Sequence, residues 1–321
     1  MQDTDLVAID LGGTHVRFAR AAVAAGRVTL GPETVLRTNA HASLAAAWCA
    51  VEEAQGVRLP PSAAVAVAGP ITGGRARMTN HPWVVDEAEL RAALGLDRVV
   101  LLNDFAAVAH AVRACSAAQL RHLAGPDLPL PVEGVVSVIG PGTGLGVAML
   151  DGARVIATEG GHIAFAPQDG VEQAVAAVLA EQHGRVSAER VVSGAGLRAF
   201  CAAIAPDHPV PGEDAALWSA ALGRHDRVAA LALSHFCAAL GSVAGDLALA
   251  HGAHALVLAG GLGLRLADTL PGTAFAARFR AKGRFEAHMA ALPVRIITHA
   301  QPGLLGAAAA FAHMERAPLQ G

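Results

Sequence analysis

Asp10-Leu11-Gly12-Gly13-Thr14 and Gly140-Pro141-Gly142-Thr143-Gly144 are the two stretches of this 321-residue sequence that decide its fold. Each follows a run of apolar, largely β-branched residues, at 6–9 and at 135–139. After each loop apolar residues recur at every second position, which predicts a second strand and not a helix. A further turn and a third strand, ending near residue 30 and near residue 157, complete each unit. The pattern of strand, glycine hairpin, strand, turn and strand therefore occurs twice.

The repeated glycine loops indicate phosphate binding. A glycine hairpin exposes backbone N–H groups and lets an anion approach them closely, and a threonine hydroxyl adds a donor. Two such loops facing each other would hold a polyphosphate from both sides. Ordinary hairpin turns are the alternative interpretation, and the repetition together with the acid at Asp10 disfavours it.

Other phosphate loops are excluded by simple observations. A Walker loop needs a lysine just before its serine or threonine. The one lysine of this sequence, Lys282, lies in an unrelated stretch. A dinucleotide-binding loop needs a helix directly after its glycines, and neither loop is followed by one.

Composition describes a globular protein with few other signals. Hydrophobic residues make up 53% and charged residues 16%, and the net charge of −3 gives no electrostatic footprint for nucleic acid or an anionic membrane. The four cysteines are far apart and form no CxxC pair, which argues against disulfides or a zinc site. The acidic start leads straight into a strand, so we expect no signal peptide and a cytoplasmic protein. Residues 247–264 carry no charge, but glycines interrupt them, which favours a helix end and a buried strand over a membrane span.

The rest of the chain reads as two mixed sheets decorated by helices. We expect helices at 42–55, 86–94, 106–114, 171–182, 187–192, 226–250 and 304–314. Further strands are expected at 63–68, 99–102 and 255–259. This pattern predicts a two-lobed α/β protein with a cleft between a smaller and a larger lobe.

Asn103-Asp104 follows an apolar strand, where working side chains of open α/β sheets commonly lie. A carboxylate there could take the proton from a hydroxyl that attacks phosphorus. Alternatively, Asp104 only caps the helix that follows.

Three further short motifs each have two interpretations. Glu159-Gly160-Gly161-His162 suits a tight turn that aims two polar side chains into one pocket, or a solvated surface turn. Glu189 either binds a ligand or complements the dipole of a short helix. Gly260-Gly261, like the glycine turn at 193–196, either packs against a flat nucleotide base or serves only as a helix cap.

The order of these motifs is specific. The series is Asp10-Leu-Gly-Gly-Thr-x-x-Arg17, Met78-Thr-Asn-His81, Leu102-Asn-Asp-Phe105, Gly140-x-Gly-Thr-Gly-Leu-Gly146, Glu159-Gly-Gly-His162, Ser187-Ala-Glu-Arg-Val191 and Leu258-Ala-Gly-Gly261. It closely resembles the bacterial glucokinase family, of the hexokinase, actin and Hsp70 superfamily with ribonuclease-H-like lobes. The resemblance runs from about residue 6 to Gly306.

The resemblance implies a role for each motif. Asp104 would be the base that deprotonates the sugar 6-hydroxyl. The other sugar hydroxyls would be bound by Asn103, Glu159, His162 and Glu189. ATP phosphates would be held by Gly12, Gly13, Thr14, Gly142 and Thr143. Asp10 would position Mg²⁺ through water, and Gly260 and Gly261 would lie beside the adenosine. His15 stands where the family usually has asparagine, so the role of that side chain is open.

The sequence therefore predicts an ATP-dependent kinase that makes glucose 6-phosphate, the first step of glycolysis. A kinase for another hexose or an amino sugar is the alternative, and a sugar sensor without activity or an actin-like ATPase on the same fold is less well supported. We expect domains at 1–112 with 302–321 and at 113–301, a homodimer, and no nucleic-acid or membrane partner.

Overall fold

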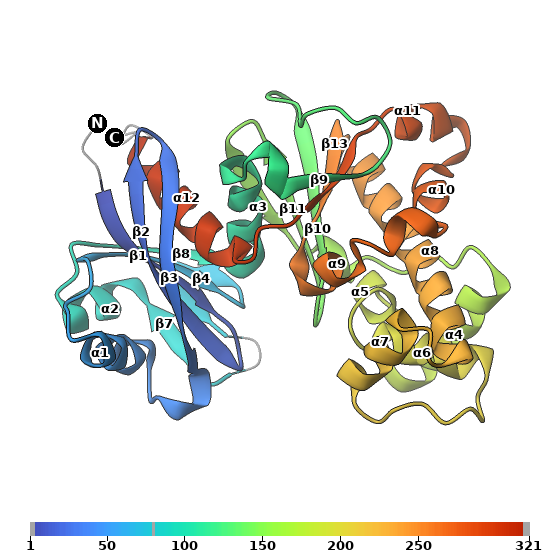
Figure 1. Cartoon of the computed structure of the whole chain (residues 1–321), viewed down its shortest axis with the longest axis horizontal. Helices are drawn as coiled ribbons and strands as arrows, with labels where there is room; N and C mark the ends of the chain where they lie inside the picture. Colours follow the sequence, from blue (N-terminus) through green and yellow to red (C-terminus); the bar gives the residue numbers. More distant parts are fainter. Residues whose placement is uncertain (1–3, 79–80, 317–321) are drawn as a thin grey trace. The chain divides into compact units, whose positions relative to one another are not determined.

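The computed structural model describes residues 4–78 and 81–316 and divides into two compact units (Figure 1). Unit 1 comprises Met1–Ser116 and His299–Gly321, and unit 2 comprises Ala117–Thr298. The domain limits expected from the sequence fall a few residues from these boundaries.

Unit 1 is built on a five-stranded sheet in the order β3-β2-β1-β4-β8. Its strands are β1 (Thr4–Leu11), β2 (His15–Ala24), β3 (Arg27–Arg37), β4 (Ser62–Val67) and β8 (Arg98–Asn103). The first three strands pair antiparallel, whereas β4 and β8 run parallel to β1. The first glycine loop is thus the hairpin between β1 and β2, as predicted. The third strand continues to Arg37, beyond the end near residue 30 that the sequence suggested.

Both faces of this sheet are covered. Along β1, Val7, Ile9 and Leu11 belong to a core shared with the helix α1, while Leu6 and Ala8 belong to a second core shared with α12. The helices and short strands of unit 1 are η1 (Thr38–Ala40), α1 (Leu44–Gln55), β5 (Ile71–Thr72), β6 (Arg75–Arg77), β7 (Val84–Asp86), α2 (Glu87–Leu94), α3 (Asp104–Ala114) and α12 (Pro302–Arg316). A strand buried on both faces carries apolar residues at successive positions, which explains the unbroken run at 6–9.

Unit 2 repeats the arrangement with a six-stranded sheet in the order β12-β11-β10-β13-β14-β9. Its strands are β9 (Leu120–Ala124), β10 (Val135–Pro141), β11 (Leu145–Asp151), β12 (Arg154–Thr158), β13 (Ala255–Leu258) and β14 (Val294–Ile297). Antiparallel β10, β11 and β12 correspond to β1, β2 and β3, and β13 and β14 run parallel to β10. The duplication predicted from the two loops is therefore present in the structure.

Helices make up most of the rest of unit 2. They are η2 (Ala117–Gln119), η3 (Gly160–His162), α4 (Gly170–His183), α5 (Ala188–Val191), α6 (Gly196–Ile204), α7 (Asp214–Leu222), α8 (Arg227–Ala250), α9 (Gly260–Leu266), η4 (Leu270–Gly272), α10 (Phe275–Arg280), η5 (Gly283–Phe285) and α11 (Glu286–Ala290). Helix α8 is long and apolar enough to cross a membrane, but most of it is buried inside the unit, packed against α6, α7 and α10. Its apolar composition is therefore explained by its burial among the other helices of unit 2.

The helices α3 and α12 pack closely in unit 1, and α3 begins at Asp104. Gly306 of α12 lies directly against the α3 backbone, so that a methyl group there would overlap the carbonyl oxygen of Ala107. The contact between these helices therefore fixes how closely α12 approaches the element that carries Asp104.

Replacing Gly306 by alanine should destabilise unit 1, because backbone and not a flexible side chain blocks the new methyl. Overpacking costs about 1–3 kcal/mol or more, so we expect the thermal midpoint to fall by roughly 5 °C or more. Gly170→Ala is the matched control, since a methyl at this helical glycine meets nothing within 4 Å. Calorimetry of both variants tests the prediction, and equal midpoints would contradict it.

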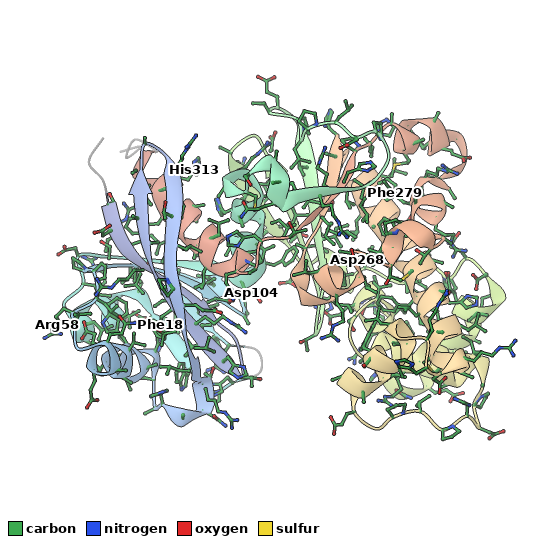
Figure 2. The ribbon with its side chains drawn as sticks, viewed as in Figure 1. Phe18, Arg58, Asp104, Asp268, Phe279 and His313 are labelled. Carbon is green, nitrogen blue, oxygen red and sulfur yellow. The ribbon has the colours of Figure 1, made fainter. Side chains whose placement is uncertain are left out.

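The same helix pair carries two histidines. The rings of His110 in α3 and His313 in α12 lie with their centroids 6.2 Å apart (His313 is labelled in Figure 2). Burial, and secondarily the neighbouring His313, lowers the pKa of His110 to about 4 from its ordinary value of 6.5. A histidine in the unfolded chain binds a proton below about pH 6.5, whereas folded His110 stays neutral until about pH 4.

This difference predicts a pH dependence of stability. As pH falls from 6.5 towards 4, the unfolded chain takes up a proton that the folded chain does not, so the free energy of unfolding decreases. His110→Gln should flatten this part of the profile by about 1–2 kcal/mol between pH 7 and pH 5. Urea titrations of both proteins at the two pH values measure the effect, and parallel losses would contradict the assignment.

Candidate active site

The first glycine loop is closed within itself. The N–H of Gly12 donates to the carbonyl of His15 at 2.9 Å, which completes the turn between β1 and β2. This N–H is therefore used in the hairpin, and the loop presents Gly13 and Thr14 beyond it. Thr14 is exposed, whereas Gly12 and Gly13 are half-buried.

Asp10 lies at the end of β1, where neighbouring groups hold its carboxylate. Arg17 on β2 approaches it at 3.9 Å and also lies 3.8 Å from Glu33. The Asp10 side chain is 27% exposed. Burial raises the pKa of Asp10 above its ordinary value, while Arg17 acts in the opposite direction. The first turn of α12 abuts this carboxylate, since a methyl group at Gly303 would lie 2.8 Å from Asp10 Oδ2.

Asn103 and Asp104 lie where β8 ends and α3 begins. Asn103 is the N-cap of α3, where its Oδ1 accepts from the N–H groups of Phe105 and Ala106 at 3.0 and 3.1 Å. Its amide nitrogen donates to the Gly69 carbonyl at 3.4 Å. Asp104 is the first residue of the helix, half-buried, with Oδ1 accepting from the N–H of Phe105 at 2.8 Å (Figure 2). Asn103 is therefore the N-cap of α3, and Asp104 also accepts one of the first N–H groups of the helix.

The second glycine loop has the same closure and an additional support. The N–H of Gly142 donates to the Gly144 carbonyl at 2.8 Å. The Gly142 carbonyl accepts from the N–H of Gly194 at 2.7 Å. The carbonyl of Gly194 in turn accepts from the buried indole N–H of Trp218 at 2.8 Å. The glycine turn at 193–196 is therefore hydrogen-bonded to this loop, a contact that the sequence did not indicate.

Glu189 contacts the second loop directly. Its Oε2 accepts from the N–H of Leu145 at 3.0 Å, and a methyl group at Gly144 would overlap this oxygen. The carboxylate is thus tied to the start of β11, and not only to the dipole of its own short helix α5. The Glu189 carboxylate can come this close to the loop only because Gly144 has no side chain.

Glu159 and His162 lie on the short turn η3, which packs against the same corner of unit 2. Their side chains are 3.8 Å apart and 81% and 57% exposed. The turn is held beside α5 by a β-bridge between Ala164 and Ser187. A methyl group at Gly161 would overlap the Leu145 carbonyl. The structure therefore brings Glu159, His162 and Glu189 into one corner with the second glycine loop.

Gly260 and Gly261 open the helix α9, where the sequence suggested a turn. Gly260 has φ of +78°, and a methyl group on it would lie 2.7 Å from the Pro141 carbonyl. Only glycine suits both the positive φ and this close approach. Gly260 thus adjoins the second loop.

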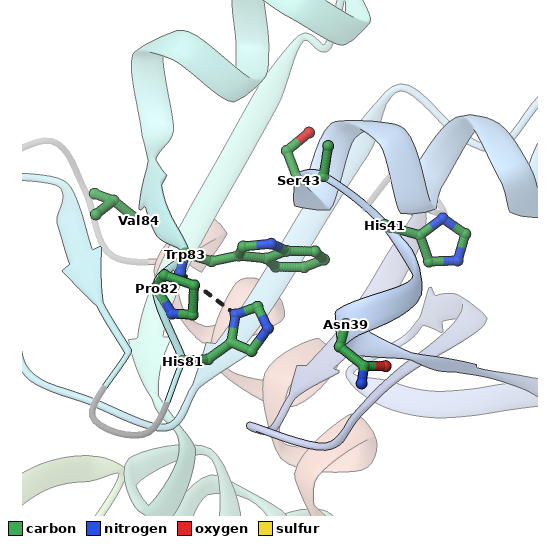
Figure 3. Close-up of a pocket in the computed structure, with 8 residues that line it drawn as sticks. Asn39, His41, Ser43, His81, Pro82, Trp83 and Val84 are labelled. Atoms are coloured by element: carbon green, nitrogen blue, oxygen red, sulfur yellow. Dashed lines mark hydrogen bonds between the residues drawn. The ribbon is translucent and has the colours of Figure 1, made fainter.

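A pocket of about 590 Å³ in unit 1 is lined by Asn39, residues 41–43 and residues 81–84. Figure 3 shows His81 and Trp83 on one side of it, with Asn39 and His41 on the other. The His81 and Trp83 rings meet edge to face with centroids 5.2 Å apart. Of the motif that contains His81, Thr79 and Asn80 lie outside the described residues. None of the residues predicted to bind substrates lines this pocket.

Within residues 4–78 and 81–316, no group of three or more histidine, cysteine or acidic side chains could hold a metal ion. Asp10 lies in the strand that leads into the first glycine loop.

The predicted residues thus form two groups, one in each unit. In unit 1 they lie at the ends of the parallel strands β1 and β8, and in unit 2 they lie around the second glycine hairpin. A family model described as glucokinase matches residues 6–314. The chain belongs to the glucokinase family.

Individual relatives agree with this membership along their whole length. The glucokinase of Zymomonas mobilis is 51% identical over 317 residues, covering 96% of this chain and 98% of the relative. That of Neisseria gonorrhoeae is 40% identical over 316 residues, covering 94% and 93%. The crystal structure of a glucokinase from an Antarctic psychrotroph superimposes with a TM-score of 0.84 at 30% identity, covering 96% and 99%. The two-lobed α/β fold expected from the sequence is confirmed.

Proposed function

We propose that this member of the glucokinase family transfers the γ-phosphoryl group of ATP to the 6-hydroxyl of glucose, with Asp104 as general base. Membership in the family supports the reaction. The observation that supports the base is the position of Asp104 after β8. Asn103 is the N-cap of α3, and Asp104 follows it as the half-buried first residue of that helix, at the end of β8.

The two hairpins suit the phosphates of ATP. In the first loop Gly12 closes the turn, and Gly13 with Thr14 would supply N–H and hydroxyl donors. In the second loop Gly142 closes the turn and Thr143 would donate. Fixed donors of this kind stabilise the charge on a phosphoryl group as it is transferred. Gly260, which packs against Pro141 of the second loop, and the adjacent Gly261 would lie beside the adenosine.

Asp10 suits a magnesium ion that arrives with the nucleotide. Its carboxylate is held by the adjacent Arg17 and by the first turn of α12, and no competing ligand cluster is found in the described residues. Bound with ATP, Mg²⁺ would neutralise charge on the phosphates. One carboxylate acting through water fits the preference of Mg²⁺ for water and phosphate ligands.

Polar side chains would bind the hydroxyl groups of the sugar. Asn103 adjoins the base, and Glu159, His162 and Glu189 share their corner of unit 2. Asp104 would accept the proton of the sugar 6-hydroxyl. The hydroxyl oxygen would form the new bond to the γ-phosphorus, while the bond between that phosphorus and the leaving oxygen of ADP breaks. Enzymes accelerate phosphoryl transfer almost entirely by positioning the reactants and by stabilising the charge of the transition state.

The proposal includes a cytoplasmic homodimer that needs neither nucleic acid nor membrane. The four cysteines are all unpaired, which agrees with a reducing compartment. The dimer is an expectation that light scattering on the purified protein would test.

Asp104→Asn should lower kcat by about 10²–10⁴-fold, because the amide cannot accept the proton. Glucose binding should persist, since the amide still forms hydrogen bonds and Asn103 still caps the helix. A coupled assay of ADP release across several hexoses, with calorimetry of glucose binding, measures both. Turnover near the wild-type level would remove Asp104 from the base role, and a better substrate than glucose would redirect the assignment to another sugar.

Substitutions of Glu189 should separate its contact with the loop from its proposed contact with the sugar. In Glu189→Gln the amide oxygen can still accept from the Leu145 N–H, so the KM for ATP should change little. The loss of charged hydrogen bonds should lower kcat/KM for glucose by about 10- to 100-fold. Glu189→Ala removes both contacts and should impair both substrates. Equal effects of the two variants on ATP would contradict this separation.

A further inference from the structure

Thr38 is a fully buried polar residue beside the first glycine loop. It begins η1, directly after β3, and its exposed fraction is 0%. A buried hydroxyl must find a partner, because an unpaired one costs about 1–3 kcal/mol. Both donors of Thr38 point to the same loop. Its Oγ1 donates to the Gly12 carbonyl at 2.9 Å, and its backbone N–H donates to the Thr14 carbonyl at 3.0 Å.

These two bonds determine how the loop presents its own donors. In a planar trans peptide the carbonyl and the following N–H point in opposite directions. With the Gly12 carbonyl held by Thr38, the N–H of Gly13 is directed to the side away from Thr38. Glycine residues have little intrinsic preference between peptide orientations, so an external donor is needed to select one.

We propose that Thr38 is a positioning residue for the nucleotide. It fixes the Gly12–Gly13 peptide so that the Gly13 N–H is preset to meet a phosphate oxygen. This inference rests on the proposed binding of ATP phosphates by the loop. Thr38 touches no substrate in this role. It acts by orienting the Gly12–Gly13 peptide before ATP binds.

A purely structural role is the competing explanation. Thr38 stands where β3 ends, next to the pairing of His15 with Arg37, and it could serve only to hold the strand end. The two explanations differ in what they predict for the substrates. Loss of a strand contact lowers stability and affects glucose and ATP alike, whereas loss of peptide orientation weakens ATP selectively.

The test compares Thr38→Val, which keeps the shape and removes the donor, with Thr38→Ser, which keeps the donor. Thr38→Val should weaken binding of a nonhydrolysable ATP analogue and raise the KM for ATP by about 10-fold. The KM for glucose should stay within about twofold, and Thr38→Ser should bind the analogue nearly as well as the wild type. Ser242→Ala is the control, because it removes another buried hydroxyl, bonded to Arg278, that contacts neither glycine loop.

Each outcome decides the matter. Equal weakening of ATP and glucose in Thr38→Val, or an analogue affinity equal to that of the wild type, would overturn the proposal. So would a Thr38→Ser variant as defective as Thr38→Val. If Thr38→Val does not fold by circular dichroism, Thr38→Ala carries the same comparison, and failure of both to fold assigns the hydroxyl to the fold alone. A wild-type protein that binds no ATP analogue would instead refute the proposed function.

Discussion

Each glycine hairpin is closed by a backbone hydrogen bond inside the loop, and the rest of the site is arranged around these closures. Gly12 and Gly142 donate to carbonyls two or three residues ahead, so each loop turns back at once into the next strand. The strand that enters and the strand that leaves then pair along their length. A longer or looser connection would carry the loop donors away from the end of the sheet. In unit 1 the tight turn keeps the loop donors at the edge of the sheet where Asp10 also lies.

Close backbone packing recurs wherever the site residues gather. Gly144 leaves room for the Glu189 carboxylate, Gly161 for the Leu145 carbonyl and Gly260 for the Pro141 carbonyl. In each contact the main chain of the glycine lies directly against the neighbouring group, with no side chain between them. The main chain has fewer ways to move than a side chain. The second loop and the Glu189 carboxylate are therefore held by contacts with neighbouring main chain. Such support is what a site needs if its groups are to meet a substrate in a fixed geometry.

Much of this could be predicted from the sequence because the decisive signals are local. The hairpins are marked by glycine between alternating strands, and α1 by Ser43 as its N-cap and Gly56 in the left-handed conformation as its C-cap. The long helix at 226–250 was evident from composition alone. By contrast, β9 and β14 are short, and they become strands through pairing with each other and with β13. Strands that depend on distant partners leave a weak pattern in the sequence.

The site shows the same limit at finer scale. Asn103 and Asp104 both suit a helix cap by residue type, and only the observed hydrogen bonds assign the task to Asn103. Glu189 was considered with its own helix, yet its partner is the N–H of Leu145, 44 residues earlier. No sequence motif marks Thr38, because a threonine after a strand is common and Thr38 is distinguished only by its burial against a loop 26 residues away. Sequence motifs identify the groups that can meet substrates, while the groups that orient them are defined by contacts that only the folded chain creates.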